Sequence, residues 1–247
     1  GVWLANTHLL NLAVPLLLSL VGVRLAIYAL RMGFEPRTSL RMWERTASWL
    51  IWGAFALHIT GLLPRIHAAM EALSLHEANP GHHFQISIQR EQRDLPKFRR
   101  FGGYTAFSEG WALYAESLGQ ALGMYTDPYQ YFGRLEGELW RAIRLVVDTG
   151  LHSKGWTREQ VLEYMDANSS AAEARRVSET ERYMAIPGQA LAYKIGQLKI
   201  SELRARAEKE LGPKFDVRKF HTAVLMDGAL PLDVLEAKVD RWIASQR

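Results

Sequence analysis

The sequence predicts an all-α protein, in which almost every ordered segment is a helix. Apolar side chains recur at the three- and four-residue spacing of an amphipathic helix, and proline, glycine and capping residues mark the ends of such runs. In contrast, no run alternates polar and apolar residues convincingly at the period of a strand. We therefore expect a mostly helical protein, with room for no more than a short hairpin.

Boundary signals place most of the predicted helices along the chain. An amphipathic helix begins near Pro64, and another covers Phe107 to Leu118. Asp127 is a typical N-cap and Pro128 a typical first residue, so a long helix is expected from there to about His152. The later signals are a stop at Gly155, a capping box at Thr157–Gln160, a helix from Pro187 to Leu211, a helix that is capped by Asp216 and stops at Gly228, and a last helix opened by Pro231.

Composition limits the class of protein. The chain has 247 residues, 48% of them hydrophobic, which suits one sizeable domain, with or without a small extra segment, and excludes disorder. Because there is no cysteine, disulfide scaffolds and thiol chemistry are excluded, and a metal site must use His, Asp or Glu. The net charge of +4 is small and the basic residues are scattered, so nucleic-acid binding is not expected. The sequence predicts no particular oligomeric state.

The beginning of the chain differs in character from the rest, and we treat residues 1–63 as a separate apolar helical segment. Its apolar runs are Leu9 to Leu30 and Trp49 to Leu63. One interpretation makes them membrane helices, since roughly 20 apolar residues span a bilayer. The other buries them inside a soluble helical domain, which Arg24 in the first run favours. We slightly favour membrane association through residues 9–63.

A histidine-rich stretch points to metal chemistry. His76, His82 and His83 are three of the 8 histidines of the chain, and they lie beside Glu77. A zinc hydrolase needs two imidazoles, a third ligand, an open position and a carboxylate that takes the proton of a water molecule. The usual motif, H-E-x-x-H on one helix, fails here because its second histidine is replaced by proline. A helix break at Pro80-Gly81 would still bring His82 back toward His76; the alternative is a surface turn with incidental histidines.

A third ligand is expected from a following helix. The segment FSEGWALYAE contains Glu109 and Glu116, whose spacing places them on one helical face. Glu109 lies among apolar and aromatic residues, where a carboxylate is costly unless it is paired or bound to a metal. The alternative is a surface glutamate near the positive end of a helix. Glu116 is a candidate to orient a ligand histidine by accepting its second N–H group.

Further polar residues are candidates for supporting roles. Arg144, Asp148 and His152 share a helical face, so Asp148 could fix the tautomer of His152, which would then donate to a developing oxyanion. An exposed ladder of ion pairs is the alternative. His221 is expected to be a packed histidine rather than a ligand.

The polar stretch around residue 190 supplies candidates for substrate contacts. Tyr193 is the first candidate for a phenol that donates to the tetrahedral intermediate, and Tyr183 is the second. Arg182 or Lys194 could bind a substrate carboxylate, although such side chains on a helix usually face water. Gly196 weakens its helix, which predicts close packing against backbone or ligand.

Several motifs, in order, resemble the C-terminal half of the DUF885 family, bacterial proteins of uncertain function that in turn resemble zinc metallopeptidases of the gluzincin type. The motifs are HEANPGHHFQ, SEGWALYAE, VVDTGLHSKGWT, ETERYMAIPGQALAYKIGQLKISELR and FHTAVLMDGALPL. The resemblance runs from about Ser74 to the end of the chain, and residues 1–63 do not share it. It implies a metallopeptidase-like helical domain over residues 64–247.

The resemblance also implies roles for individual residues. It suggests His76, His82 and Glu109 as the ligands of one zinc ion per chain and Glu77 as the general base, with His83 as the alternative second ligand. It implies a peptide or peptide-like substrate and a bacterial source. Membrane association or export is expected, and the cytoplasm is not excluded.

Together these residues predict a zinc-dependent hydrolase of peptide-like bonds. A second hypothesis is a non-catalytic, membrane-associated or structural protein that keeps the family scaffold. A helical di-iron carboxylate protein is less favoured, because such proteins use repeated E-x-x-H pairs that this sequence lacks.

Overall fold

The computed structural model describes residues 14–15, 17–26, 28, 38–59 and 62–247. Every regular element in these residues is a helix, and they contain no strand, so the predicted all-α class is confirmed. The chain divides into two compact units, Gly1–His67 and Ala68–Arg247.

The first unit contains helical residues between 14 and 28 and the helix α2 (Thr38–Ile59). The first apolar run, Leu9 to Leu30, lies partly outside the described residues. Among the helices that the structure describes, none is both long enough and apolar enough to span a bilayer.

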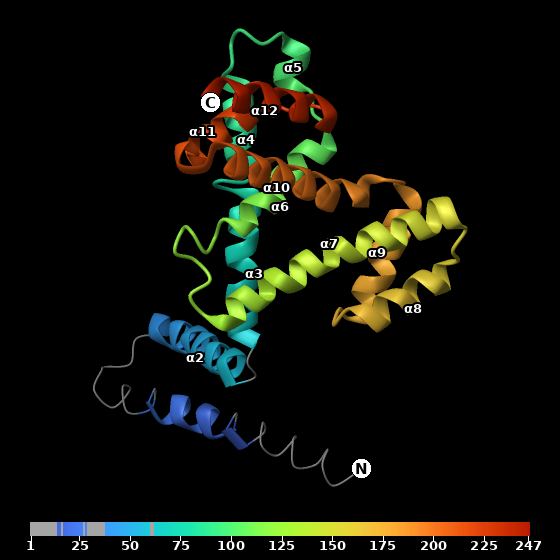
Figure 1. The fold of residues 1–247 in the computed structure, drawn as a ribbon. Coiled ribbons are helices and arrows are strands. Elements are labelled where there is room, and N and C mark those ends of the chain that lie inside the picture. The colour runs from blue at the N-terminus through green and yellow to red at the C-terminus, as the bar shows by residue number, and fades with distance from the viewer. Residues whose placement is uncertain (1–13, 16, 27, 29–37, 60–61) are drawn as a thin grey trace. The chain divides into compact units, whose positions relative to one another are not determined.

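The helix α3 (Leu62–Glu77) leads into the second unit, where the other helices follow one another with short connections (Figure 1). These helices are α4 (His82–Glu91), α5 (Lys97–Phe101), α6 (Thr105–Ser117), α7 (Pro128–Lys154), α8 (Arg158–Asn168), α9 (Glu173–Ala185), α10 (Ala192–Leu211), α11 (Val217–Leu225) and α12 (Leu232–Gln246), with short 3-10 turns η1 (Gln189–Leu191) and η2 (Gly212–Lys214) before and after α10.

The predicted helix boundaries are reproduced where local capping decides them. Asp127 caps α7, with its side chain accepting the N–H of Tyr129 and forming a capping box with Gln130. α7 ends at Lys154, and Gly155 directly after it has a left-handed backbone with φ 68°. Thr157 and Gln160 form the capping box predicted for α8.

One predicted boundary is wrong. The helix expected from Pro187 begins only at Ala192, because Gly188 adopts a left-handed turn with φ 80° and η1 follows it. The preceding helix α9 has no capping side chain at its start, so no local signal in the sequence marks this boundary.

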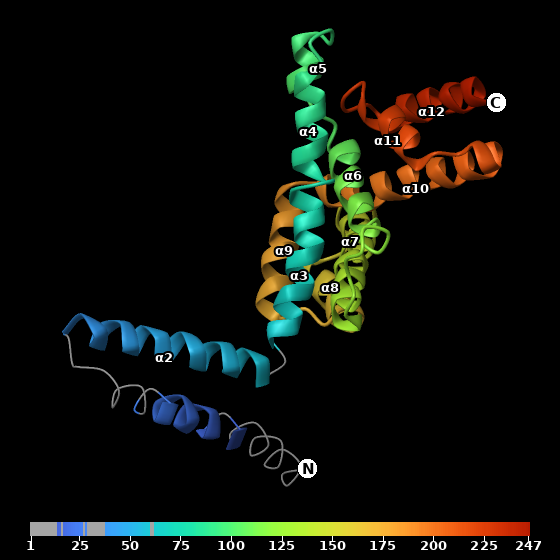
Figure 2. The same cartoon turned by 90° about the vertical axis from the view of Figure 1, so that its left-hand side faces the viewer.

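The second unit contains three apolar clusters, a small one around Leu75 and Tyr125 and two larger cores. One core joins α6, α10, α11 and α12 around Trp111, Leu203 and Phe220. The other joins α7, α8 and α9 around Val147 and Met165. Figure 2 shows α4 and α5 continuing the direction of α3 beyond the turn that separates them.

The contact between α6 and α10 links the parts of the candidate site. A Cβ atom on Gly196 would lie 1.8 Å from the carbonyl oxygen of Ala106 and 2.7 Å from the Cα atom of Gly110. The two helices therefore cross with backbone against backbone, as the sequence predicts for Gly196. This crossing brings Glu109 of α6 and Tyr193 of α10 into the same region.

Candidate metal centre

The predicted break at Pro80-Gly81 divides the histidine-rich stretch between two helices. α3 ends at Glu77, and α4 begins at His82. Gly81 makes the tight turn possible, because a Cβ atom there would lie 1.8 Å from the carbonyl oxygen of His76. The indole Nε1 of Trp111 donates to the carbonyl oxygen of Pro80 at 2.7 Å and ties the turn to α6.

Two imidazoles and one carboxylate converge at this turn. The Nε2 atom of His82 lies 3.2 Å from Oε2 of Glu109, and the Nε2 atom of His76 lies 3.4 Å from the same oxygen. The two imidazole rings are perpendicular, with centroids 4.8 Å apart. His76 is almost completely buried, whereas His82 and Glu109 are partly accessible. The group therefore combines a buried side with an open one.

The other ring nitrogen of His76 has a different kind of contact. Its Nδ1 atom lies 2.8 Å from Oε1 of Glu116, a normal distance for a charge-assisted hydrogen bond. Glu116 is buried, and Arg141 approaches the same oxygen at 3.4 Å. The structure thus places Glu116 where the sequence predicts an orienting acceptor, and it fixes Nε2 as the nitrogen that faces Glu109.

Burial and hydrogen bonds within the group shift the pKa values of His76 and Glu109 in opposite directions. Burial alone lowers the pKa of His76, but hydrogen bonds with Glu109 and Glu116 outweigh burial and raise this pKa to about 9. Burial alone raises the pKa of Glu109, but hydrogen bonds from His76 and His82 outweigh it and lower this pKa to about 2. Near pH 7 Glu109 is therefore anionic and His76 protonated, so a metal ion that binds here must displace the proton of His76.

Glu77 and His83 flank this group differently. A ligand atom of Glu77 lies within 4.8 Å of ligand atoms of His76 and His82, and its side chain is exposed. His83 is exposed and lies outside this three-residue group. Of the two histidines that could pair with His76, the structure brings His82 to the site.

Tyr193 lies beside the imidazoles, on the first turn of α10. Its ring stacks near-parallel with that of His76, with centroids 6.3 Å apart. Gln189 donates to its phenol oxygen at a long 3.4 Å, and the guanidinium of Arg144 lies 4.8 Å from its ring centroid. The structure therefore places this tyrosine next to the candidate ligands.

The expected pairing of Asp148 with His152 is not formed. Both carboxylate oxygens of Asp148 accept the backbone N–H of Gly188 at 3.2 Å, and they fix the left-handed turn before η1. His152 instead contacts the carbonyl oxygen of Tyr183 through Nε2 at 2.9 Å. The partner of His152 lies on α9, which packs against α7, and the partner of Asp148 lies in the turn that follows α9.

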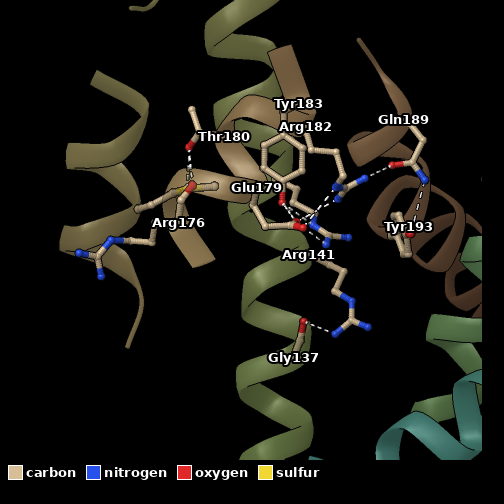
Figure 3. A network of polar contacts seen from close by, with 11 residues as sticks. Gly137, Arg141, Arg176, Glu179, Thr180, Arg182, Tyr183, Gln189 and Tyr193 are labelled. Atoms are coloured by element: carbon tan, nitrogen blue, oxygen red, sulfur yellow. Dashed lines mark hydrogen bonds and ion pairs between the residues drawn. The ribbon is translucent and has the colours of Figure 1, made fainter. Parts of the chain in front are cut away.

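The basic candidates for substrate binding already have carboxylate partners. Arg182 pairs with Glu179 at 2.9 Å and also donates to Gln189, as Figure 3 shows. Lys194 pairs with Glu138 at 2.6 Å. Lys194 thus joins α10 to α7, and Arg182 joins α9 to the turn η1.

Tyr183 is a buried member of the same polar network (Figure 3). Its hydroxyl donates to Glu179 at 2.6 Å and accepts from Arg144 at 2.8 Å. Burial raises the pKa of Tyr183 to about 12. Burial would also raise the pKa of Glu179, but hydrogen bonds from Arg182 and Tyr183 outweigh it and lower this pKa to about 2.

Glu179 is the residue that sequence reasoning missed. It accepts hydrogen bonds from Arg144, Arg182 and Tyr183. Its only local signal is the spacing to Arg182 and Tyr183, three and four residues away on one helix. The contact with Arg144 depends on the packing of α7 against α9, which no local pattern indicates.

His221 is packed, as the sequence predicts. Its Nε2 atom lies 2.9 Å from the hydroxyl of Tyr114, and its ring lies edge-on to Trp111. Burial, with Arg204 nearby, lowers the pKa of His221 to about 4. This histidine is therefore neutral near pH 7.

The fold and the site define a helical domain with a partly buried cluster of histidine and glutamate. The chain belongs to the family described as "Bacterial protein of unknown function (DUF885)", whose sequence pattern matches residues 51–239. The match begins within the second apolar run, earlier than the resemblance noticed from about Ser74. No curated protein matches the chain.

Two bacterial proteins, each described as a "putative lipoprotein", are among the solved structures that are similar to this chain. The "putative lipoprotein from Colwellia psychrerythraea" is 54% identical, with a TM-score of 0.69, and the match covers 70% of this chain and 30% of that chain. The "putative lipoprotein of unknown function from Shewanella oneidensis" is 25% identical, with a TM-score of 0.65, and the match covers 72% of this chain and 33% of that chain. The present chain thus spans about a third of the length of these relatives.

Proposed function

We propose that this domain is a zinc-dependent hydrolase of peptide-like bonds. His76, His82 and Glu109 would hold one zinc ion per chain, and Glu77 would serve as the general base. The earlier resemblance to gluzincin-type metallopeptidases supports the assignment, as does the chemistry of the ligand set, since zinc sites with one open position often use two histidines and one carboxylate.

The observation that carries the proposal is the convergence of two imidazole nitrogens on one carboxylate oxygen. Two ligands of a tetrahedral zinc ion, each at roughly 2.0–2.2 Å from the metal, lie about 3.3 Å apart. The two nitrogen–oxygen distances here are 3.2 and 3.4 Å. Both exceed the roughly 2.7–2.9 Å of a charge-assisted hydrogen bond, a distance that His76 does reach with Glu116. The direct contacts of the two imidazoles with Glu109 are thus long, and the spacing is also compatible with a cation shared by the three side chains.

The roles of the surrounding residues follow from their positions. A bound zinc ion supplies a Lewis acid that polarises a carbonyl group and lowers the pKa of water. Glu77, exposed beside the ligands, takes the proton of the attacking water and returns it to the leaving amine. Tyr193 donates a hydrogen bond to the oxygen on which negative charge develops.

Three of the earlier candidates have no part in this proposal. Arg182 and Lys194 are neutralised by Glu179 and Glu138, and His152 is occupied by the carbonyl of Tyr183. We therefore assign no substrate carboxylate to Arg182 or Lys194 and no oxyanion to His152. Because both solved relatives carry the word lipoprotein in their descriptions, we propose a location outside the cytoplasm for this bacterial chain as well.

Hydrolysis of a mixed peptide library by the zinc-loaded protein tests the proposal. Wild-type protein should cleave members of the library, and Glu77→Gln should retain zinc but lose cleavage, by about 100-fold or more. Glu91→Gln, which changes an exposed glutamate on the neighbouring helix, is the matched control and should behave as wild type. A zinc-loaded wild-type protein that cleaves no peptide would refute the hydrolase assignment.

A non-catalytic, membrane-associated protein is the second candidate. It is favoured by large apolar side chains of the first unit that are exposed to solvent, among them Leu17, Leu18 and Leu50. Co-sedimentation with vesicles of phosphatidylethanolamine and phosphatidylglycerol tests it. Loss of co-sedimentation in a Leu17→Ser, Leu18→Ser, Leu50→Ser variant would support membrane binding, and a wild-type protein that stays in the supernatant would exclude it.

A further inference from the structure

Arg144 of α7 is a buried cation that the proposed function does not use. Its Nε atom donates to the hydroxyl of Tyr183 at 2.8 Å, and its Nη2 atom donates to Glu179 at 2.9 Å. Its guanidinium also lies 4.8 Å from the ring centroid of Tyr193. A single side chain from α7 thus contacts both α9 and the first turn of α10.

The contacts of Arg144 form part of a cyclic network of side chains. Glu179 accepts from Arg144 and from Arg182, and Arg182 donates to Gln189 at 2.8 Å. Gln189 in turn donates to the phenol oxygen of Tyr193, the ring that Arg144 covers. The network of side chains is therefore cyclic. It contacts Tyr193 both at the face of its aromatic ring and at its phenol oxygen.

This arrangement leaves the phenol able to donate. In the contact with Gln189, the amide supplies the hydrogen and the phenol oxygen accepts it. The hydroxyl hydrogen of Tyr193 is then available for another acceptor. The side chain is only partly buried, and its ring lies against that of His76.

We propose that Arg144 is a positioning residue, which holds the ring of Tyr193 beside the candidate zinc ligands so that its phenol meets the developing oxyanion. The inference rests on the proposed hydrolase function. Arg144 acts through Tyr193 and does not itself touch substrate. The planar fork of arginine suits this role, because it reaches Glu179 and Tyr183 while its face stays over the ring, which a lysine ammonium cannot do.

A double-mutant cycle between Arg144 and Tyr193 tests the inference in the zinc-loaded protein. Tyr193→Phe and Arg144→Met should each lower kcat by about 10- to 100-fold, with KM and zinc content unchanged. The double variant should lose no more than Tyr193→Phe alone, because Arg144 has no other route to the reaction. Losses that multiply in the double variant, or an Arg144→Met variant with wild-type kcat, would overturn the proposal.

Two further variants keep the test decisive. Arg175→Met removes another guanidinium that lies over an aromatic ring, 4.7 Å from the centroid of Trp140, and should leave kcat unchanged. If Arg144→Met does not fold, Arg144→Lys replaces it and should show the same non-additive pattern with a smaller loss.

A spectroscopic arm separates failure of this inference from failure of the hydrolase assignment. Protein labelled with 3-fluorotyrosine gives one ¹⁹F resonance for Tyr193, identified by its absence in Tyr193→Phe. This resonance should shift in Arg144→Met or Arg144→Lys and stay in place in Arg175→Met, whether or not any peptide is cleaved. An unchanged Tyr193 resonance in the Arg144 variants would refute the positioning role even in an active enzyme.

Discussion

Gly110 of α6 and Gly196 of α10 face each other without side chains between them. A Cβ atom on Gly110 would lie 2.4 Å from the Cα atom of Gly196, well inside van der Waals contact. The residue before Gly110 is the candidate ligand Glu109, and Tyr193 lies about one turn before Gly196 on α10. The close approach of Gly110 and Gly196 therefore helps to set the distance between Glu109 and Tyr193, although neither glycine has a reactive side chain.

Replacing Gly196 by alanine should destabilise the protein by about 1–3 kcal/mol or more, because the added methyl group meets backbone atoms that cannot turn aside. Urea unfolding of the two proteins measures the difference. Gly137→Ala is the matched control, since a Cβ atom there meets only the end of the flexible side chain of Arg141. That variant should change stability by no more than about 1 kcal/mol, toward greater stability. Equal effects of the two substitutions would show that the α6–α10 crossing is not tight.

Glu116→Gln should weaken zinc binding by about 10- to 100-fold, because the charge that holds His76 through Nδ1 is lost. Competition with a chromophoric chelator measures the affinity. Glu71→Gln changes another carboxylate of the same region, one that accepts from Tyr125 and Gln130, and should bind zinc as wild type does. If both variants bound zinc equally well, Glu116 would have no orienting role.

The buried neutral His221 should make stability depend on pH. In the unfolded chain this residue binds a proton near pH 6.5, whereas the folded protein resists protonation down to about pH 4. Between these values the unfolded state binds more protons, so the free energy of unfolding falls as the pH drops from 6.5 to 4. Above pH 6.5 the residue adds no pH dependence.

The comparison of wild type with His221→Gln isolates this effect, because glutamine does not titrate. The stability advantage of wild type should be largest above pH 6.5 and should shrink toward pH 4, measured by urea unfolding in the presence of a chelator. A difference between the two proteins that stays constant with pH would contradict the assigned environment of His221.

The sequence predicted those parts of the structure that depend on neighbouring residues. The capping boxes at Asp127 and Thr157 involve partners three residues away, and the break at Pro80-Gly81 follows from the geometry of these two residues. The late start of α10 was missed because Pro187 is a common first residue of a helix, and the left-handed turn at Gly188 is fixed by Asp148, which is distant in the sequence.

The residues of the candidate site likewise fall into those that local sequence patterns predicted and those that depend on contacts distant in the sequence. His76 and His82 could be paired from the sequence because they flank one turn, and Glu109 because a carboxylate is costly in an apolar helix. Glu179 could not be predicted from the sequence, because its role depends on a hydrogen bond from Arg144, which lies on a separate helix. The sequence does not indicate which carboxylates pair with Arg182 and Lys194. These partners are seen only in the folded structure.

The central claim is that His76, His82 and Glu109 share one metal ion. Crystals of the protein grown with zinc, and measured on both sides of the zinc absorption edge, test this claim most directly. We expect one anomalous peak per chain, in contact with Nε2 of His76, Nε2 of His82 and Oε2 of Glu109, and no such peak in Glu109→Ala. A zinc-soaked crystal with no peak among these three atoms, or with a peak that survives in Glu109→Ala, would contradict the account.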